Sequence, residues 1–327
     1  TDRGSENASL FGLFYKCLPD KTYALQSETC HGGKYSKQRL TIMCAANMDG
    51  SEKFPLLVIG KSKKPRCFKN VKSLPVIYES NSKAWMTSAL FEKWITDLDQ
   101  KFASEGRKVL LFVDNCSAHP KAVQEKLQAI ELKFFPPVLQ PLDLGIIKNL
   151  KHYYRHTLVK QRLCEMENNS ESSDITVLDA INIIARAWSE DVKPETVANC
   201  FRKAGFTIGS HSLELHDSNI DDELDELDIP VPFATYCAVD ENVLTSSLMT
   251  DEDIIESVME ENLEESVEND ESFTEAPQPI PTFEVNSESV RQNLLDMHAI
   301  LQVTDHVPAE IYQKFYSIER LLMKQYC

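Results

Sequence analysis

The amino-acid sequence predicts an α/β protein in which a mixed sheet is flanked by helices and is followed by an acidic disordered segment and a short helical region. Apolar runs rich in strand-forming residues are separated by stretches of helical periodicity. Charge divides the 327 residues as well. Residues 1–206 hold 30 basic and 23 acidic residues, a net +7, whereas residues 207–327 hold 4 and 28, a net −24. We therefore expect a folded body followed by an acidic tail.

Five apolar runs of strand length lie in the body. The run at 109–113 is uniformly apolar, as expected of a strand buried on both faces. Asp49-Gly50, between two of the other runs, is a hairpin turn signal, and Pro136-Pro137 ends the last run. The predicted strands are 10–15, 39–47, 54–60, 109–113 and 131–135.

Helical patterns separate and follow these runs. Residues 87–102 carry Leu90, Trp94, Leu98 and Phe102 at four-residue steps, with Ser and Thr available as caps. The other predicted helices are 121–130, 144–163, 176–190 and 194–204. Strands followed by alternating helices and strands make a sheet with helices on its faces.

The composition changes after residue 206. Residues 214–275 are crowded with Asp and Glu and contain few aromatics, so they cannot bury enough apolar surface to offset chain entropy. Residues 285–326 are predicted to be helical again, with a break near Val307-Pro308. Ile311, Phe315, Ile318 and Leu322 are expected to line one face of a helical hairpin that packs on the body or on a partner. We divide the chain into a domain at 7–206, an acidic, largely disordered linker at 207–284 and a helical segment at 285–327.

Several protein classes are excluded. No run of 18 apolar residues is present, so we expect no membrane span. The chain opens at Thr1 without a charged and then apolar leader, which argues against a secretory signal and for an N-terminally cut fragment. The nine cysteines are odd in number and show no C-x-x-C spacing, which favours reduced thiols in the cytosol or nucleus over a disulfide framework or a zinc ribbon.

Two acids stand at chemically suggestive places in the body. Asp114 directly follows the buried run 109–113, at the carboxyl end of a strand, where sites of α/β proteins gather, and Asn115 and His119 lie nearby. Asp143 stands at the start of the helix predicted at 144–163. A helix N-terminus tolerates a carboxylate, so capping alone also explains Asp143. Taken together, the two acids predict a carboxylate pair for Mg²⁺ or Mn²⁺.

Basic residues of the body form two clusters, and both are expected to contact phosphates, although an ordinary solvated face explains either cluster equally well. The first cluster comprises Lys61, Lys63, Lys64 and Arg66. The second comprises Lys148, Lys151, Arg155, Lys160 and Arg162.

The body resembles the DDE catalytic domain of the pogo/Tigger group of transposases, the relatives of jerky and centromere protein B. The resemblance covers residues 7–206. It is carried by Gly12-Leu-Phe-Tyr-Lys-Cys-Leu-Pro19, by Lys37 to Gly50, by Pro55 to Arg66, by Phe112-Val-Asp-Asn115 with His119, by Leu139-Gln-Pro-Leu-Asp143 with Ile146, Lys148 and Asn149, and by Asn199 to Phe206. The family implies an RNase H-like fold, a nuclear location, DNA as partner and three acids that bind two divalent metal ions, Mg²⁺ or Mn²⁺, for displacement at a DNA phosphate. By this resemblance Asp114 and Asp143 match the second and third acids.

Three departures from the family pattern stand out. Ser9 occupies the place of the first acid, and a hydroxyl does not replace a carboxylate that neutralises metal charge. The loop between Pro137 and Val138 lacks four residues, which puts the position of Asp143 in doubt. The helix-turn-helix modules that family members carry are absent before the domain, so we expect DNA binding that is weak, salt-sensitive and indifferent to sequence.

Three hypotheses follow from these features. The first is a transposase-derived nuclear protein that keeps residual DNA binding but has lost strand-transfer chemistry. The second is an active metal-dependent DNA endonuclease or transposase. The third is a protein-interaction module that acts through the acidic tail and the last helices. No small-molecule substrate is expected.

Overall fold

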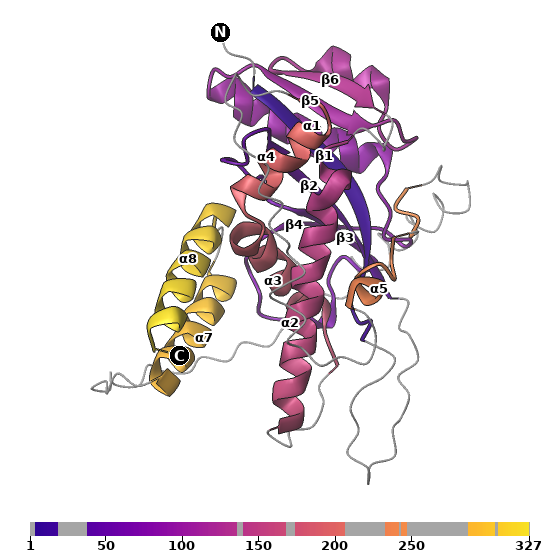
Figure 1. Ribbon diagram of the computed structural model, residues 1–327. Coiled ribbons are helices and arrows are strands. Elements are labelled where there is room, and N and C mark those ends of the chain that lie inside the picture. The colour runs from indigo at the N-terminus through magenta and orange to yellow at the C-terminus, as the bar shows by residue number, and fades with distance from the viewer. Residues whose placement is uncertain are drawn as a thin grey trace.

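A six-stranded sheet forms the centre of the computed structural model, which describes residues 4–18, 38–135, 140–167, 174–206, 233–241, 243–246, 287–304 and 307–326 (Figure 1). The strand order is β4-β3-β2-β1-β5-β6. All five predicted strands are present, and β4 adds a short strand at the edge. The strands are β1 (Gly4–Phe14), β2 (Arg39–Asn47), β3 (Leu57–Gly60), β4 (Ile77–Ser80), β5 (Val109–Asp114) and β6 (Ile130–Phe135).

Only β2 runs against the others. It pairs antiparallel with both β1 and β3, whereas β3 pairs parallel with β4, and β5 pairs parallel with β1 and β6. Three consecutive antiparallel strands, with parallel strands added beside the first, make the predicted RNase H-like mixed sheet. One consequence matters for the site: the carboxyl ends of β1, β3 and β5 all lie at the same end of the sheet.

Helices cover both faces of this sheet. The alternation of β1 assigns Phe11 and Leu13 to one core and Ala8 to the other. The first core also contains Tyr154 and Trp188, and the second is filled by α1. The helices of the body are α1 (Ser88–Ser104), α2 (Ile147–Glu167), α3 (Val177–Arg186) and α4 (Pro194–Lys203). The helix expected at 87–102 is confirmed, with Thr87 as the cap that accepts a hydrogen bond from the Leu90 N–H at 3.3 Å.

The helix predicted at 121–130 is wrong, because the chain forms only a 3₁₀ turn at Lys121–Lys126. Asp99 on α1 explains the difference. Its carboxylate accepts hydrogen bonds from the backbone N–H groups of residues 128, 129 and 130 at 2.7–3.1 Å. Those N–H groups are therefore committed to α1 and cannot continue a helix.

The long helix predicted at 144–163 is confirmed as α2, but its first turn differs. Residues Leu142–Ile146 form a π-helical turn that leads directly into α2. A second π turn, Ala187–Asp191, follows α3 inside the helix predicted at 176–190. The wider first turn places Asp143 before the regular part of α2, next to Ser9 of the interior strand β1.

The last helices form the predicted hairpin. Helices α7 (Ser287–Val303) and α8 (Ala309–Tyr326) pack on the body, where Tyr312 donates a hydrogen bond to the Ser73 carbonyl at 3.0 Å (Figure 1). The expected contact face of α8 is partly wrong, because Ile311 and Ile318 are exposed. The body instead contacts Tyr312, Phe315 and Tyr316, all buried.

Part of the segment expected to be disordered is described by the structure. Residues 233–241, with the short helix α5 (Phe233–Cys237), and residues 243–246 pack against the body. The rest of 207–284 lies outside the described residues. Within the described part of the chain, no helix combines the length and apolarity that crossing a membrane requires.

Candidate active site

A pocket of about 400 Å³ opens on the face of the sheet that α2 covers, and it brings together Ser9, Asp114 and Asp143. Asp114 is the last residue of β5, and Ser9 lies on the adjacent strand β1. Asn7 of β1 pairs with Phe112 of β5, and Ser9 and Asp114 each lie two residues further along their strands. Asp143 reaches the pocket from the π turn before α2. The two acids that the sequence singled out therefore face a common space.

Ser9 contacts Asp143 directly. Its hydroxyl donates a hydrogen bond of 2.8 Å to Asp143 Oδ1, and the Ser9 side chain is buried within β1. Position 9 of β1 thus lies directly next to Asp143.

The buried Asn7 fixes the loop that carries Asp143. Its Nδ2 donates to the Phe112 carbonyl at 3.0 Å, and its Oδ1 accepts the Leu142 N–H at 3.0 Å. These bonds tie β1 to β5 and to the residue before Asp143. Leu142 and Asp143 are therefore held against β1, and residues 136–139 before them lie outside the described part of the chain. Sequence inspection gave Asn7 no role, because an Asn in a strand is not by itself a signal.

The electrostatics of the pocket favour a cation. Although Asp143 as a residue is exposed, partial burial of its carboxylate raises its pKa to about 6. The hydrogen bond from Ser9 lowers the pKa, and the negative charge of Asp114 raises it further. The negative charge of Asp114 thus disfavours ionisation of Asp143, and a positive ion between the two carboxylates would favour it.

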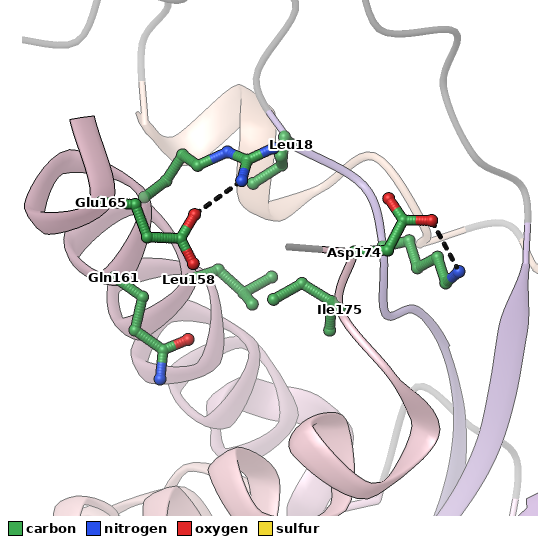
Figure 2. Close-up of a pocket in the computed structure, with 8 residues that line it drawn as sticks. Leu18, Leu158, Gln161, Glu165, Asp174 and Ile175 are labelled. Carbon is green, nitrogen blue, oxygen red and sulfur yellow. Dashed lines mark hydrogen bonds and ion pairs between the residues drawn. The ribbon is translucent and has the colours of Figure 1, made fainter. Parts of the chain in front are cut away.

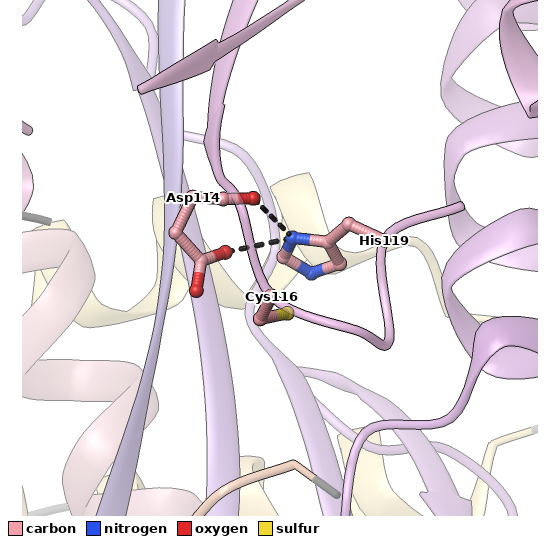
Figure 3. A group of neighbouring side chains, drawn as sticks. All are labelled: Asp114, Cys116 and His119. Atoms are coloured by element: carbon pink, nitrogen blue, oxygen red, sulfur yellow. Dashed lines mark hydrogen bonds and ion pairs between the residues drawn. The ribbon is translucent and has the colours of Figure 1, made fainter. Parts of the chain in front are cut away.

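His119 contacts the carboxylate of Asp114 (Figure 3). Its buried Nδ1 lies 2.7 Å from Asp114 Oδ1 and 3.1 Å from the Asp114 carbonyl oxygen, and its ring packs on Phe91. Burial lowers the pKa of His119, but the contacts with Asp114 and Cys116 outweigh burial and raise it to about 9. A protonated His119 partly neutralises Asp114 and holds its side chain in one orientation. Asn115, by contrast, is exposed.

These residues fit one divalent cation. Asp143 uses Oδ1 to accept from Ser9, and Asp114 Oδ1 lies 2.7 Å from His119 Nδ1. Among the described residues, Oδ2 of each carboxylate makes no hydrogen bond or ion pair. Mg²⁺ is commonly held by one or two carboxylates together with substrate phosphates. Cys116 also offers a donor atom within 4.8 Å of an Asp114 carboxylate oxygen. Beside the two carboxylates, Ser9 contributes a neutral hydroxyl to the pocket.

The first basic cluster lies at the same end of the sheet as Asp114. Residues 61–66 follow the carboxyl end of β3, and β3 runs parallel to β5 within the sheet. All four of its basic side chains, those of Lys61, Lys63, Lys64 and Arg66, belong to exposed residues. Their position is therefore compatible with contact to an extended polyanion that enters the pocket.

The second basic cluster divides into exposed and buried members. Lys148 is exposed at the pocket, and Lys160 is exposed further along α2. The expectation that Lys151 and Arg155 form part of a solvated basic surface is wrong, because both are buried in ion pairs of 2.6 Å with Asp240. Asp240 comes from the acidic segment, and no motif distinguished it from its acidic neighbours in the sequence.

A second hollow lies beside the far part of α2, where Leu158, Gln161 and Glu165 line it (Figure 2), and Arg162 belongs to the same lining. Its guanidinium pairs with Glu165 at 2.6 Å, and Lys16 lies 3.7 Å from Asp174 across the same hollow. The space, about 40 Å³, is large enough for only one or two water molecules. Its paired charges do not constitute a second site for chemistry.

Comparisons with known proteins agree with the geometry. The pattern of the DDE superfamily endonuclease family matches residues 37–201. The chain is 47% identical over 204 residues to Tigger transposable element-derived protein 4 of Mus musculus, covering 61% of this chain and 39% of that protein. It is 35% identical over 211 residues to Major centromere autoantigen B of Homo sapiens, covering 63% and 34%.

The chain therefore spans well under half the length of these curated relatives. Among solved structures, it resembles a pre-cleavage Mos1 transpososome at 13% identity and a TM-score of 0.31, covering 62% of this chain and 56% of that one. A Mos1 paired-end complex with Mg is similar at 15% identity and the same TM-score, covering 63% and 56%.

Proposed function

Because this chain belongs to the DDE superfamily endonuclease family, as a transposase-derived member related to Tigger proteins and centromere autoantigen B, we propose that it is a DNA-binding protein of the nucleus whose strand-transfer chemistry is lost. The nuclear location is supported by the names of its relatives, which include a centromere autoantigen and an ARS-binding protein. We also propose the division into a domain at 7–206, an acidic linker at 207–284 and a helical segment at 285–327.

The observation that carries the proposal is the hydrogen bond between Ser9 and Asp143. In a pocket with three carboxylates, the third negative charge lets two metal ions share the site and stabilise both the attacking and the leaving oxygen. Ser9 supplies a neutral hydroxyl instead. Asp114 and Asp143 would hold a single Mg²⁺ or Mn²⁺ ion, whose positive charge would attract a DNA phosphate to the pocket.

A nicking assay tests the loss of chemistry. The purified chain is incubated with supercoiled DNA and Mn²⁺, beside the variant Asp114→Ala. We expect both proteins to leave the DNA supercoiled. Cleavage by the wild-type chain that disappears in Asp114→Ala would support the alternative, an active metal-dependent endonuclease, and would refute the proposed loss.

DNA binding is tested by retention of a duplex of arbitrary sequence. The double variant Lys63→Ala/Lys64→Ala removes two exposed charges that follow β3, at the carboxyl end of the sheet. The matched control, Lys101→Ala/Lys108→Ala, removes two charges near the amino end of β5. Each lost phosphate contact lowers the slope of log affinity against log salt by about 0.9, so we expect a slope lower by about 1.8 in the first variant alone. Equal behaviour of the two variants would contradict binding at the carboxyl end.

We further propose that the acidic tail engages basic protein partners, since residues 207–327 carry a net charge of −24. The test compares partners captured by the full chain with those captured by a chain in which the acids of 221–228 are changed to amides. Loss of salt-sensitive partners is expected. An unchanged set of partners would refute a role for this block.

A further inference from the structure

The described residues 233–241 and 243–246, here called the strap, form part of the wall of the pocket that contains Asp114 and Asp143. Residues from both halves of the strap line that pocket: Cys237, Ala238, Asp240, Glu241, Val243 and Thr245. Helix α5, at the start of the strap, lies against α2 (Figure 1). A segment far along the chain from the two acids therefore reaches the site they form.

Asp240 is the most enclosed contact of the strap. Its Oδ1 lies 2.6 Å from Lys151 Nζ, and its Oδ2 lies 2.6 Å from an Nη2 donor of Arg155 and accepts the Phe14 N–H at 3.0 Å. The Asp240 side chain is fully buried. Two cations and one backbone N–H thus converge on two oxygens of a single anion.

The positive charge of the two cations exceeds the single negative charge that Asp240 supplies. Lys151 and Arg155 bring two positive charges to one carboxylate, and the buried Arg155 Nε has no hydrogen-bond partner among the described residues. A phosphodiester offers the same two acceptor oxygens and the same single charge as a carboxylate, with further oxygens that can accept. Arginine and lysine together are common ligands of such groups.

The site is also continuous with the acids of the pocket. Lys148, Lys151 and Arg155 follow one another at three and four residues along α2, which places them on one face of the helix. Lys148 and Lys151 line the same pocket as Asp143, which precedes the helix. A DNA backbone with one phosphate at Asp114 and Asp143 would therefore have its next phosphates along this face.

Further hydrogen bonds hold the strap to the body. Tyr236 donates to the Cys17 carbonyl at 2.6 Å, and the Met86 N–H donates to the Thr245 carbonyl at 2.8 Å. Val243 packs directly over Gly12, where an added Cβ would come within 2.5 Å of the Val243 side chain. The strap thus depends on the absence of a side chain at position 12.

We propose that Lys151, Arg155 and the Phe14 N–H form a phosphate subsite for the DNA backbone, and that the strap closes this subsite by inserting Asp240 in place of a phosphate. This inference rests on the proposed DNA binding. DNA and the strap compete for the same cations, so the chain binds DNA more weakly than its body alone permits.

The first test removes the competing charge. Asp240→Asn keeps the shape of the side chain, and Glu241→Gln, the matched control, removes one charge from an exposed neighbour on the same strap. Two additional phosphate contacts steepen the salt slope by about 1.8, which corresponds to about tenfold between 50 and 200 mM salt. We expect Asp240→Asn to bind a duplex of arbitrary sequence about tenfold more tightly near 50 mM salt, with the gain largely lost near 200 mM. Glu241→Gln removes a charge from the pocket wall but frees neither cation, so we expect it to gain much less.

A second variant avoids unpaired buried cations, which can prevent folding. Gly12→Ala displaces Val243 by steric overlap and leaves every charge unchanged. Hydrogen exchange of the backbone N–H groups of residues 233–246 should rise in Gly12→Ala, and in the wild-type chain when the duplex is added. Binding of the duplex should strengthen in the same direction as in Asp240→Asn.

The outcomes separate this inference from the proposed function. If the wild-type chain retains DNA but Gly12→Ala frees the strap without strengthening retention, competition by the strap is refuted and DNA binding stands. If the strap is freed and no variant retains DNA at any salt concentration, both are refuted. If added duplex leaves exchange of the strap unchanged while binding tightly, the duplex does not use this subsite.

Discussion

Restoring a carboxylate at position 9 tests whether the pocket keeps the architecture of a metal site. In Ser9→Asp, the new carboxylate replaces the hydroxyl that now donates to Asp143 Oδ1 at 2.8 Å. It would join Asp143, whose pKa is already raised to about 6, and Asp114 beside it. Three carboxylates would then converge in one pocket with no metal ion between them, although Lys148 and Lys151 belong to its lining.

The cost of that arrangement can be estimated. Two unit charges about 4 Å apart repel by about 4 kcal/mol at an effective dielectric constant of about 20. Uptake of a proton relieves part of this, because the pKa of Asp143 rises further, so we expect a loss of about 2–4 kcal/mol near neutral pH. For a domain of about 200 residues this lowers Tm by roughly 5–12 °C. Mn²⁺ at about 100 times its Kd returns about 2.7 kcal/mol.

Thermal unfolding with and without Mn²⁺ measures these effects. Ser9→Asn is the matched control, because it adds a similar volume without charge. We expect Mn²⁺ to raise Tm of Ser9→Asp by several degrees more than Tm of Ser9→Asn or of the wild-type chain. A Ser9→Asp protein that responds to Mn²⁺ no more than Ser9→Asn would refute the reasoning, because the three side chains would then not converge on a common ion.

Two further predictions concern stability. Burial, with the charge of Glu52, raises the pKa of Glu6 to about 7 despite Arg107, so this group lowers stability as pH rises from about 4.5 to 7. Glu6→Gln should therefore increase the free energy of unfolding by about 2–3 kcal/mol at pH 8 and by little at pH 5, as measured by urea titration. An equal effect at both pH values would contradict a buried, ionising Glu6. Thr87→Ala should cost about 1 kcal/mol through loss of the cap of α1, whereas Thr96→Ala, whose hydroxyl donates to Glu92 O within the helix, should cost less; equal losses would show that the cap is not the cause.

The apolar runs of the sequence were sufficient to locate the sheet, but they understated β1. The strand was expected at 10–15 and extends over Gly4–Phe14. Its first half carries two polar residues that break the apolar pattern: Asn7, which holds the Leu142 N–H, and Ser9, which lines the pocket. Polar residues that belong to a site thus interrupt the apolar pattern from which their own strand would be predicted. The edge strand β4 was missed for a different reason, since it is four residues long and its Ile77 is exposed.

The two acids could be identified from position alone, because each follows or precedes a strongly patterned element. Position alone could not show whether a basic side chain on α2 faces solvent. Lys151 and Arg155 owe their burial to Asp240, which lies 89 and 85 residues further along the chain. Periodicity reports which residues share a helix face, but a partner that arrives from a distant acidic segment leaves no mark on that periodicity.

The central position of β1 has a consequence for biosynthesis. Gly4 of β1 pairs with Val109 of β5, and about a hundred residues separate the two in the sequence. The second edge of β1 therefore stays uncovered until those residues have been synthesised. At 5–20 residues per second, a ribosome needs roughly 5–20 s to supply them. During that interval β1 presents an open edge to other nascent chains and to chaperones. The strand that finally covers this edge is β5, which carries Asp114. The outer strand β6 and the π turn that carries Asp143 are synthesised later, so the acid pair forms only after β1 has gained its second neighbour.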